Sequence, residues 1–157
     1  MTASRAASPK PVSIYDTTLR DGSQGEGVSF CLQDKLRLAH LLDDLGIHYV
    51  EGGWPGSNPK DIDFFRAMQD EALHQATLVA FGSTRRAGVR AAADPNLASL
   101  LKARPGAACI VGKTWDLHVR DALRVDAGEN LDMIASSVAY LKKRLPEVFF
   151  DAEHFFD

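Results

Sequence analysis

Five short apolar runs alternate along the chain with longer stretches whose apolar positions recur every three or four residues. The short runs have the length and composition of β-strands. They are VSIYD (12–16), HYVEGG (48–53), ATLVAFG (76–82), AACIVGK (107–113) and EVFFDAE (147–153). The pattern therefore predicts five strands with a helix between each pair.

The helices are predicted at residues 33–46, 58–73, 94–103 and 130–145. In the first, a broad apolar face is formed by Leu36, Leu38, Leu41, Leu42 and Leu45, and Gly46 is suited to end the helix. The second and third open with Asn58-Pro59 and Asp94-Pro95, a cap residue followed by a proline in the first turn.

Strands that are separated by one helix each cannot pair as hairpins, so we expect a parallel sheet with right-handed crossovers. The strands begin roughly 30 to 40 residues apart, which is close to the roughly 31 residues per unit of an eightfold barrel. We therefore expect an α/β fold in which residues 12–157 form about five β/α units, the N-terminal part of a (β/α)8 TIM barrel. A complete five-stranded doubly wound domain is the alternative. An open half-barrel has unpaired edges, so the chain alone is expected to be marginally stable or self-associating.

The composition fits one globular domain, with 45% hydrophobic and 25% charged residues and a net charge of −3. The acidity argues against general binding to nucleic acids or anionic membranes. Residues 1–11 are small and polar, which indicates a leader without a secretory signal. Cys31 and Cys109 lie in apolar stretches, and we expect two small buried residues in a reducing compartment rather than a disulfide or a metal pair. No run has the length of a membrane span, so a cytoplasmic location is expected.

Charged, glycine and aromatic residues follow each predicted strand. The segments that follow the strands are DTTLRDGSQ, EGGWPGSNP, FGSTRR, GKTWDLH and DAEHFFD. The segments that precede the strands (LGI, HQAT, RPGA, RLPE) show no comparable concentration of such residues. In parallel α/β folds the working surface lies beyond the carboxyl ends of the strands. Loops are polar in any protein, but the asymmetry at five strand ends favours an active site.

Arg20 and Asp21 are adjacent in the first of these loops. If the backbone turns there, both side chains can enter one cavity. A carboxylate can hold a hard divalent cation, and a guanidinium can clamp a substrate carboxylate or stabilise an oxyanion. The alternative is a surface ion pair of little energy.

The stretch YDTTLRDGSQGEGVSF resembles the signature of the pyruvate-carboxyltransferase-like (β/α)8 enzymes. These include 2-isopropylmalate, homocitrate and citramalate synthases and hydroxymethylglutaryl-CoA lyase. The stretches EGGWPGSNPKD, AFGSTRR, GKTWDLHV and DAEHFFD resemble the citramalate branch more closely than the isopropylmalate branch. The resemblance runs from Val12 to Asp157.

The resemblance implies roles for individual residues. Arg20 would stabilise the developing enolate or alkoxide oxygen, Asp21 would be a metal ligand, and Glu153 would do acid–base or polarising work near the acyl-CoA. The implied substrate-binding residues are Gln24, Glu51, Thr84 and His118, of which Glu51 would face the 2-keto acid. Trp54 either shapes the keto-acid pocket or serves in packing.

The implied reaction is a Claisen-type condensation of acetyl-CoA with pyruvate to (R)-citramalate and CoA, in isoleucine biosynthesis. It would use a divalent cation (Mg, Mn or Zn) that makes the keto carbon electrophilic, and the full-length enzyme is expected to form a homodimer. One alternative is 2-isopropylmalate or homocitrate synthase, which would use a larger 2-keto acid.

The family completes its metal site with a His-x-His pair, and no such pair occurs among the histidines His40, His48, His74, His118 and His154. One carboxylate supplies too few ligands for a catalytic cation. This chain alone is therefore expected to be inactive, and a second alternative is an inert barrel fragment that acts as an interaction module.

Overall fold

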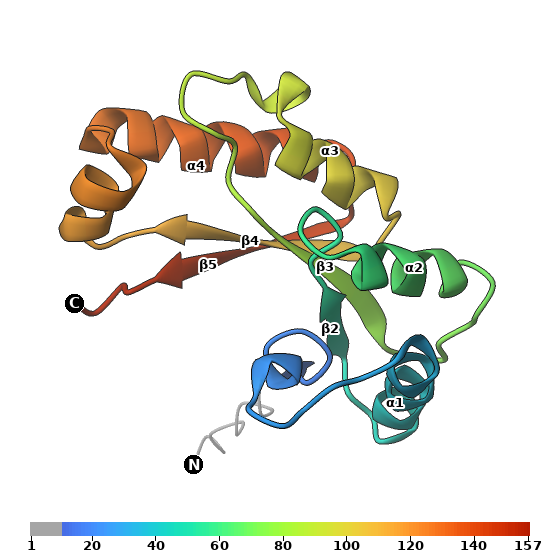
Figure 1. The fold of residues 1–157 in the computed structure, drawn as a ribbon. Helices are drawn as coiled ribbons and strands as arrows, with labels where there is room; N and C mark the ends of the chain where they lie inside the picture. Colours follow the sequence, from blue (N-terminus) through green and yellow to red (C-terminus); the bar gives the residue numbers. More distant parts are fainter. Residues whose placement is uncertain (1–10) are drawn as a thin grey trace, which may run out of the picture.

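The centre of the computed structural model is a parallel sheet with the strand order β1-β2-β3-β4-β5 (Figure 1). The structure describes residues 11–157, so the expected leader lies outside the described residues except for its last position. The strands are β1 (Tyr15–Asp16), β2 (Tyr49–Gly53), β3 (Thr77–Ser83), β4 (Ala107–Lys113) and β5 (Glu147–Glu153). All five predicted strands are present, although β1 is shorter than its predicted run.

The four predicted helices are also present, as α1 (Leu32–Asp44), α2 (Pro59–Ala67), α3 (Pro95–Lys102) and α4 (Ala127–Lys142). The side chains of Asn58 and Asp94 cap α2 and α3 as expected. Helix α2 ends six residues before its predicted end; Asp70 and Glu71 follow it, and negative charge is unfavourable at a helix C-terminus. No helix among residues 11–157 is long and apolar enough to cross a membrane.

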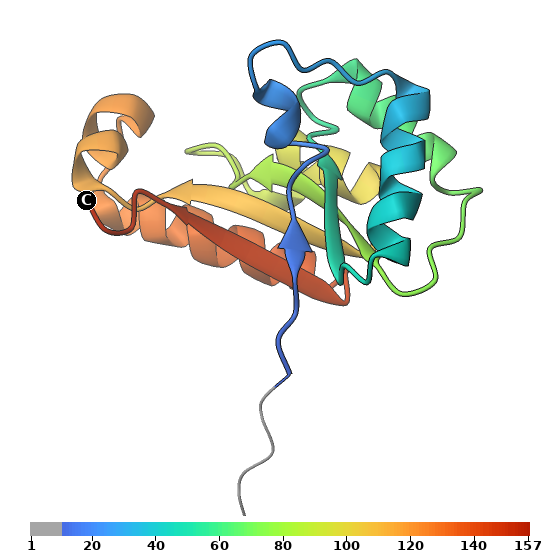
Figure 2. The same cartoon turned by 90° about the horizontal axis from the view of Figure 1, so that it is seen from below.

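All four helices cover the same, convex face of the curved sheet (Figures 1 and 2). The main core lies in this layer, where Val50, Ala80 and Ile110 of the strands pack against helix residues that include Phe64, Leu97, Leu100 and Leu141. A doubly wound domain would carry helices on both faces. The one-sided layer therefore supports the barrel-type architecture over the doubly wound alternative.

The concave face carries a second, smaller cluster, built around Val79, Phe81, Ala107 and Cys109 of β3 and β4. The ring of Phe149 from β5 packs edge-on against Tyr15 of β1, with the ring centroids 5.2 Å apart. Strands at the two edges of the described sheet therefore touch through their side chains across the concave face, as Figure 2 shows for the closeness of β1 and β5.

Two sequence expectations about burial were wrong. Helix α1 turns Lys35, Ala39 and Asp43 to the interior, and Leu41 and Leu45 are 55% and 76% exposed. Each of these leucines lies two residues, or about 200° around the helix, from an inward position. Cys31 is exposed because it occupies the N-cap of α1, where its backbone N–H donates to Asp34 Oδ2. Cys109 is buried as expected.

Asp43 joins the end of α1 to the segment that enters β3. Its buried carboxylate accepts backbone N–H groups of His74 (2.6 Å), Gln75 (2.9 Å) and Ala76 (2.7 Å). Burial raises the pKa of Asp43, but the three donors outweigh it and hold that pKa below its usual value. Asp43, Asp44 and His74 lie close enough to hold a cation. Because three N–H groups already occupy the oxygens of Asp43, we interpret this cluster as a structural clamp.

We expect Asp43→Ala to lower the free energy of unfolding by about 2–4 kcal/mol, because three buried donors lose their acceptor. A lowered folded-state pKa means that this stabilisation is complete above the unfolded value of about 3.9 and is lost as the pH falls through the folded value. Denaturant melts from pH 7 to pH 3 should show a shallower acid loss in Asp43→Ala than in the wild type. The exposed neighbour gives the control, Asp44→Ala; equal effects of the two changes would contradict the assignment.

Candidate functional site

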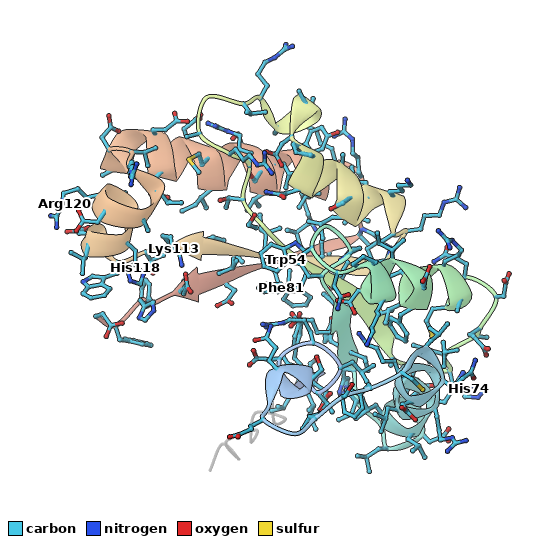
Figure 3. All side chains as sticks on the ribbon, viewed as in Figure 1. Trp54, His74, Phe81, Lys113, His118 and Arg120 are labelled. Atoms are coloured by element: carbon cyan, nitrogen blue, oxygen red, sulfur yellow. The ribbon has the colours of Figure 1, made fainter. Side chains whose placement is uncertain are left out.

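A cavity of about 560 Å³ lies at the carboxyl ends of the strands, on the side predicted from the sequence. Its lining comes from segments far apart in the chain and includes Arg20, Trp54, Phe81, Thr84, Lys113 and Glu153. Figure 3 shows Trp54 and Phe81 side by side, with Lys113 farther along the same region and His74 at the other end of the molecule. The strand ends therefore build a cavity that combines charged side chains with an aromatic wall.

Arg20 is a charged group of this cavity that two carboxylates and an aromatic ring hold in place. Its Nε donates to Glu51 Oε1 at 2.5 Å and its Nη1 donates to Asp21 Oδ1 at 3.0 Å. The guanidinium carbon lies 3.9 Å from the centroid of the Phe81 ring, a cation–π contact. Among the described residues no acceptor contacts Nη2. The guanidinium is therefore fixed on one edge and one face, and retains a donor for a ligand.

The two carboxylates that contact Arg20 differ in environment. The side chain of Glu51 is 1% exposed and that of Asp21 is 60% exposed, while that of Arg20 is 17% exposed. An ion pair shielded from water is screened far less than one at the surface. Glu51 is thus the main electrostatic partner of Arg20, and the Arg20–Asp21 pair alone resembles the surface ion pair considered from the sequence.

The loop after β1 turns Arg20 back over the sheet. The carbonyl oxygen of Thr17 accepts the N–H groups of Arg20, Asp21 and Gly22, which closes a tight turn. Leu19 is fully buried in the main core and anchors the loop. The Leu-Arg-Asp order thus places two charged side chains directly after a buried anchor.

The end of β2 is shaped by a bulge at Gly53, where φ is +145°. A Cβ atom there would lie 2.3 Å from the carboxyl carbon of Asp61, so only glycine fits. The Asp61 carboxylate accepts the N–H of Trp54 (2.8 Å) and pairs with buried Lys35 (2.6 Å). This network fixes Trp54, whose ring lies edge-on to Phe81 with the centroids 5.4 Å apart.

Glu153 ends β5 and forms an ion pair with Lys113 at the end of β4. The two residues are register partners in adjacent strands, so their side chains leave the sheet on the same face. The Thr114 hydroxyl donates to the Glu153 carbonyl oxygen at 2.6 Å and holds the strand end in place. Glu153 therefore stands at the cavity with its charge balanced by a neighbour.

Of the other residues predicted from the sequence, Thr84 lines the cavity, whereas Gln24 and His118 do not. Thr84 is buried in the cavity wall and donates its N–H to the Val111 carbonyl oxygen. Gln24 is exposed, in a 3-10 turn (Gly22–Gln24), and does not line the cavity. His118 begins a π-helical turn (His118–Leu123) and packs between Trp115 and His154, also outside the lining. The substrate-binding roles of these residues stay predictions.

Sequence reasoning missed several residues of the site, among them Lys113, Phe81 and Tyr15. Lys113 pairs with Glu153, Phe81 stacks on Arg20, and Tyr15 donates its hydroxyl to Glu51 Oε2 at 2.5 Å. The period-2 alternation of the strands could have placed Lys113 and Phe81 on the concave face. Buried Cys109 has its pKa raised to about 12 by burial, then by Glu51, so its thiol stays protonated and unreactive.

Asp21 was expected to bind a metal ion. A divalent cation in a protein takes at least four ligands, and among residues 11–157 the only cluster of three potential ligands is Asp43, Asp44 and His74. Asp21 is exposed, is engaged by Arg20, and is not part of that cluster. The described residues at the cavity therefore do not by themselves form a metal site.

Comparison with known proteins shows that residues 11–157 match the model of the HMGL-like family. Five (R)-citramalate synthases match at 50–59% identity, among them those of Geobacter sulfurreducens (59%) and Aquifex aeolicus (58%), each over 93% of this chain. The chain spans about 28% of the length of these two relatives. Homocitrate and 2-isopropylmalate synthases match at 30–38%.

Among solved structures, the hydroxymethylglutaryl-CoA lyase of Pseudomonas aeruginosa matches with a TM-score of 0.67 and 17% identity. The match covers 90% of this chain and 46% of that one. At this identity the likeness concerns the fold, and it agrees with the barrel-type arrangement of the five strands.

We expect Glu51→Ala to lower the free energy of unfolding by about 3–5 kcal/mol, because the Arg20 guanidinium would lose its buried partner. Asp21→Ala removes the exposed partner of the same arginine and should cost less than about 1 kcal/mol. Urea melts of the two variants test this contrast. Similar losses in both would mean that burial does not distinguish the two ion pairs.

Proposed function

Since this chain belongs to the HMGL-like family, we propose that it supplies about the first five β/α units of the catalytic barrel of an (R)-citramalate synthase. The whole protein would condense acetyl-CoA with pyruvate and water to give (R)-citramalate and CoA. The 50–59% identity to five citramalate synthases supports this choice. The structural observation that carries it is the guanidinium of Arg20, held at the cavity with a donor to spare.

Arg20 is suited to stabilise the oxygen on which negative charge develops. When the acetyl-CoA enolate attacks the keto carbon of pyruvate, that charge forms on the former ketone oxygen. A donor that is already oriented needs no rearrangement as the charge appears, which favours the transition state. Glu51 and Phe81 provide that orientation, since they contact one edge and one face of the guanidinium.

We assign to Glu153 the exchange of a proton near the thioester. Glu153 lies in the cavity lining together with Arg20, at the end of a different strand, so the two can act on different substrates. Lys113 holds the Glu153 side chain by an ion pair, which restricts its rotation. A carboxyl group at the cavity wall is suited either to remove the methyl proton of acetyl-CoA or to polarise the thioester carbonyl, and both roles for Glu153 stay open.

Trp54 and Phe81 form an aromatic wall beside Arg20. Such a wall restricts the volume available to the side chain of a 2-keto acid and favours the methyl group of pyruvate over a branched chain. The proposal also includes a divalent cation, toward which this chain contributes Asp21, and assembly of the whole protein as a homodimer.

The proposed substrate can be tested with the full-length protein, acetyl-CoA and one 2-keto acid at a time. We expect CoA release with pyruvate to exceed that with 2-ketoisovalerate or 2-ketoglutarate by more than about tenfold in kcat/KM, the discrimination that a few methylenes provide. CoA release is measured with a thiol reagent. A preference for 2-ketoisovalerate would favour 2-isopropylmalate synthase, and a preference for 2-ketoglutarate would favour homocitrate synthase.

Arg20→Ala in the full-length protein should lower kcat by roughly 10²–10³, as the loss of an oxyanion donor does. The matched control is Arg120→Ala, since Arg120 also pairs with the aspartate that follows it but is exposed and outside the cavity lining. Steady-state CoA release should be unchanged in this control. Equal activity of Arg20→Ala and the wild type would remove Arg20 from the mechanism.

A further inference from the structure

Tyr15 lies directly behind the Glu51–Arg20 ion pair. Its hydroxyl donates to Glu51 Oε2 at 2.5 Å, while Glu51 Oε1 accepts from Arg20 Nε at 2.5 Å. Tyr15 comes from β1 and Glu51 from β2, whereas Arg20 lies in the loop that follows β1. The three side chains form a continuous hydrogen-bonded chain from the sheet interior to the cavity.

The ring of Tyr15 is held by its neighbours. It stacks on Tyr49 with ring centroids 6.0 Å apart and meets the edge of Phe149 at 5.2 Å. Burial, followed by the effect of Cys109 and Glu51, keeps the pKa of the Tyr15 phenol well above its usual value. The hydroxyl therefore remains protonated and can only donate to the carboxylate.

This donor determines how the Glu51 carboxylate is turned. The terminal torsion of a glutamate is broad and has no strong preference of its own. With Oε2 bound to the phenol, the plane of the carboxylate is fixed and Oε1 points to Nε of Arg20. Without that bond the carboxylate could rotate or offer both oxygens to the guanidinium, which would turn the guanidinium over Phe81.

We propose that Tyr15 is a positioning residue for Arg20, acting through Glu51 to set the direction of the guanidinium donors in the cavity. The proposal rests on the proposed function for its catalytic consequence. If Tyr15 served packing alone, replacing it by phenylalanine would leave the Arg20 guanidinium in place, because the new ring would keep the aromatic contacts of Tyr15.

The experiment compares Tyr15→Phe and Tyr49→Phe in the full-length protein. Both changes remove one hydroxyl from the same aromatic stack, but only that of Tyr15 bonds to Glu51. We expect Tyr15→Phe to lower kcat about tenfold with pyruvate and acetyl-CoA, since a small misplacement of a catalytic group is costly. The KM for acetyl-CoA should stay close to wild type, and Tyr49→Phe should retain wild-type kcat.

The same tyrosine change is repeated in an Arg20→Lys background. Lysine lacks the Nε–H and the planar fork through which Glu51 would act, so Tyr15→Phe should then change kcat by less than about twofold. A tenfold loss in both backgrounds would overturn the proposal, because the tyrosine would then act independently of Arg20. Unchanged kcat of Tyr15→Phe in the wild-type background would overturn it as well.

A crystal structure of the Tyr15→Phe protein supplies a measurement that does not depend on turnover. We expect Nε of Arg20 to leave its hydrogen bond with Glu51 Oε1, and the same bond to persist in Tyr49→Phe. A guanidinium unmoved in Tyr15→Phe would overturn the proposal whatever the kinetics. If the wild-type protein forms no citramalate, the proposed function fails, and the crystal structures still decide the role of Tyr15.

Discussion

The buried carboxylate of Glu51 is the constraint on which the candidate site depends. A charged group that is 1% exposed must be paired and hydrogen-bonded, or its desolvation would cost several kcal/mol. Arg20 and Tyr15 meet that need. A pair of apolar side chains could fill the same space at no loss of stability. We infer that the ion pair matters for where it places the guanidinium, at the edge of the cavity.

The rest of the fold keeps this ion pair in place. The helices and the convex face of the sheet form the larger core, and the concave face carries a smaller apolar cluster bordered by aromatic rings. At the entry ends of the strands, the Asp43 carboxylate at the end of α1 binds the backbone N–H groups of the segment that enters β3. At the exit ends, Asp61 accepts the backbone N–H of Trp54, and the absence of a Cβ at Gly53 leaves room for the Asp61 carboxylate. The entry ends of the strands thus carry contacts that stabilise the fold, and the exit ends carry the candidate site.

The sequence was sufficient for the order of elements and for the end of the sheet that carries the site, because hydrophobic period and turn residues are local signals. It was insufficient for pairings between strands. Glu51 was selected by resemblance as a residue facing the keto acid, yet its two oxygens are occupied by Tyr15 and Arg20. Lys113 was overlooked because its partner, Glu153, is 40 residues away in the sequence. The same limit explains why Leu41 was expected inside: helical period alone does not show which side faces the sheet.

We propose that Glu51 holds Arg20 so that the free donors of the guanidinium reach the ketone oxygen of a bound 2-keto acid. A crystal structure of the full-length protein with pyruvate tests it most directly. We predict the ketone oxygen within about 3 Å of an Arg20 Nη atom, the usual hydrogen-bond length, with Nε still on Glu51. Pyruvate bound with its ketone oxygen away from Arg20, or an Arg20 that leaves Glu51 to reach it, would contradict the claim.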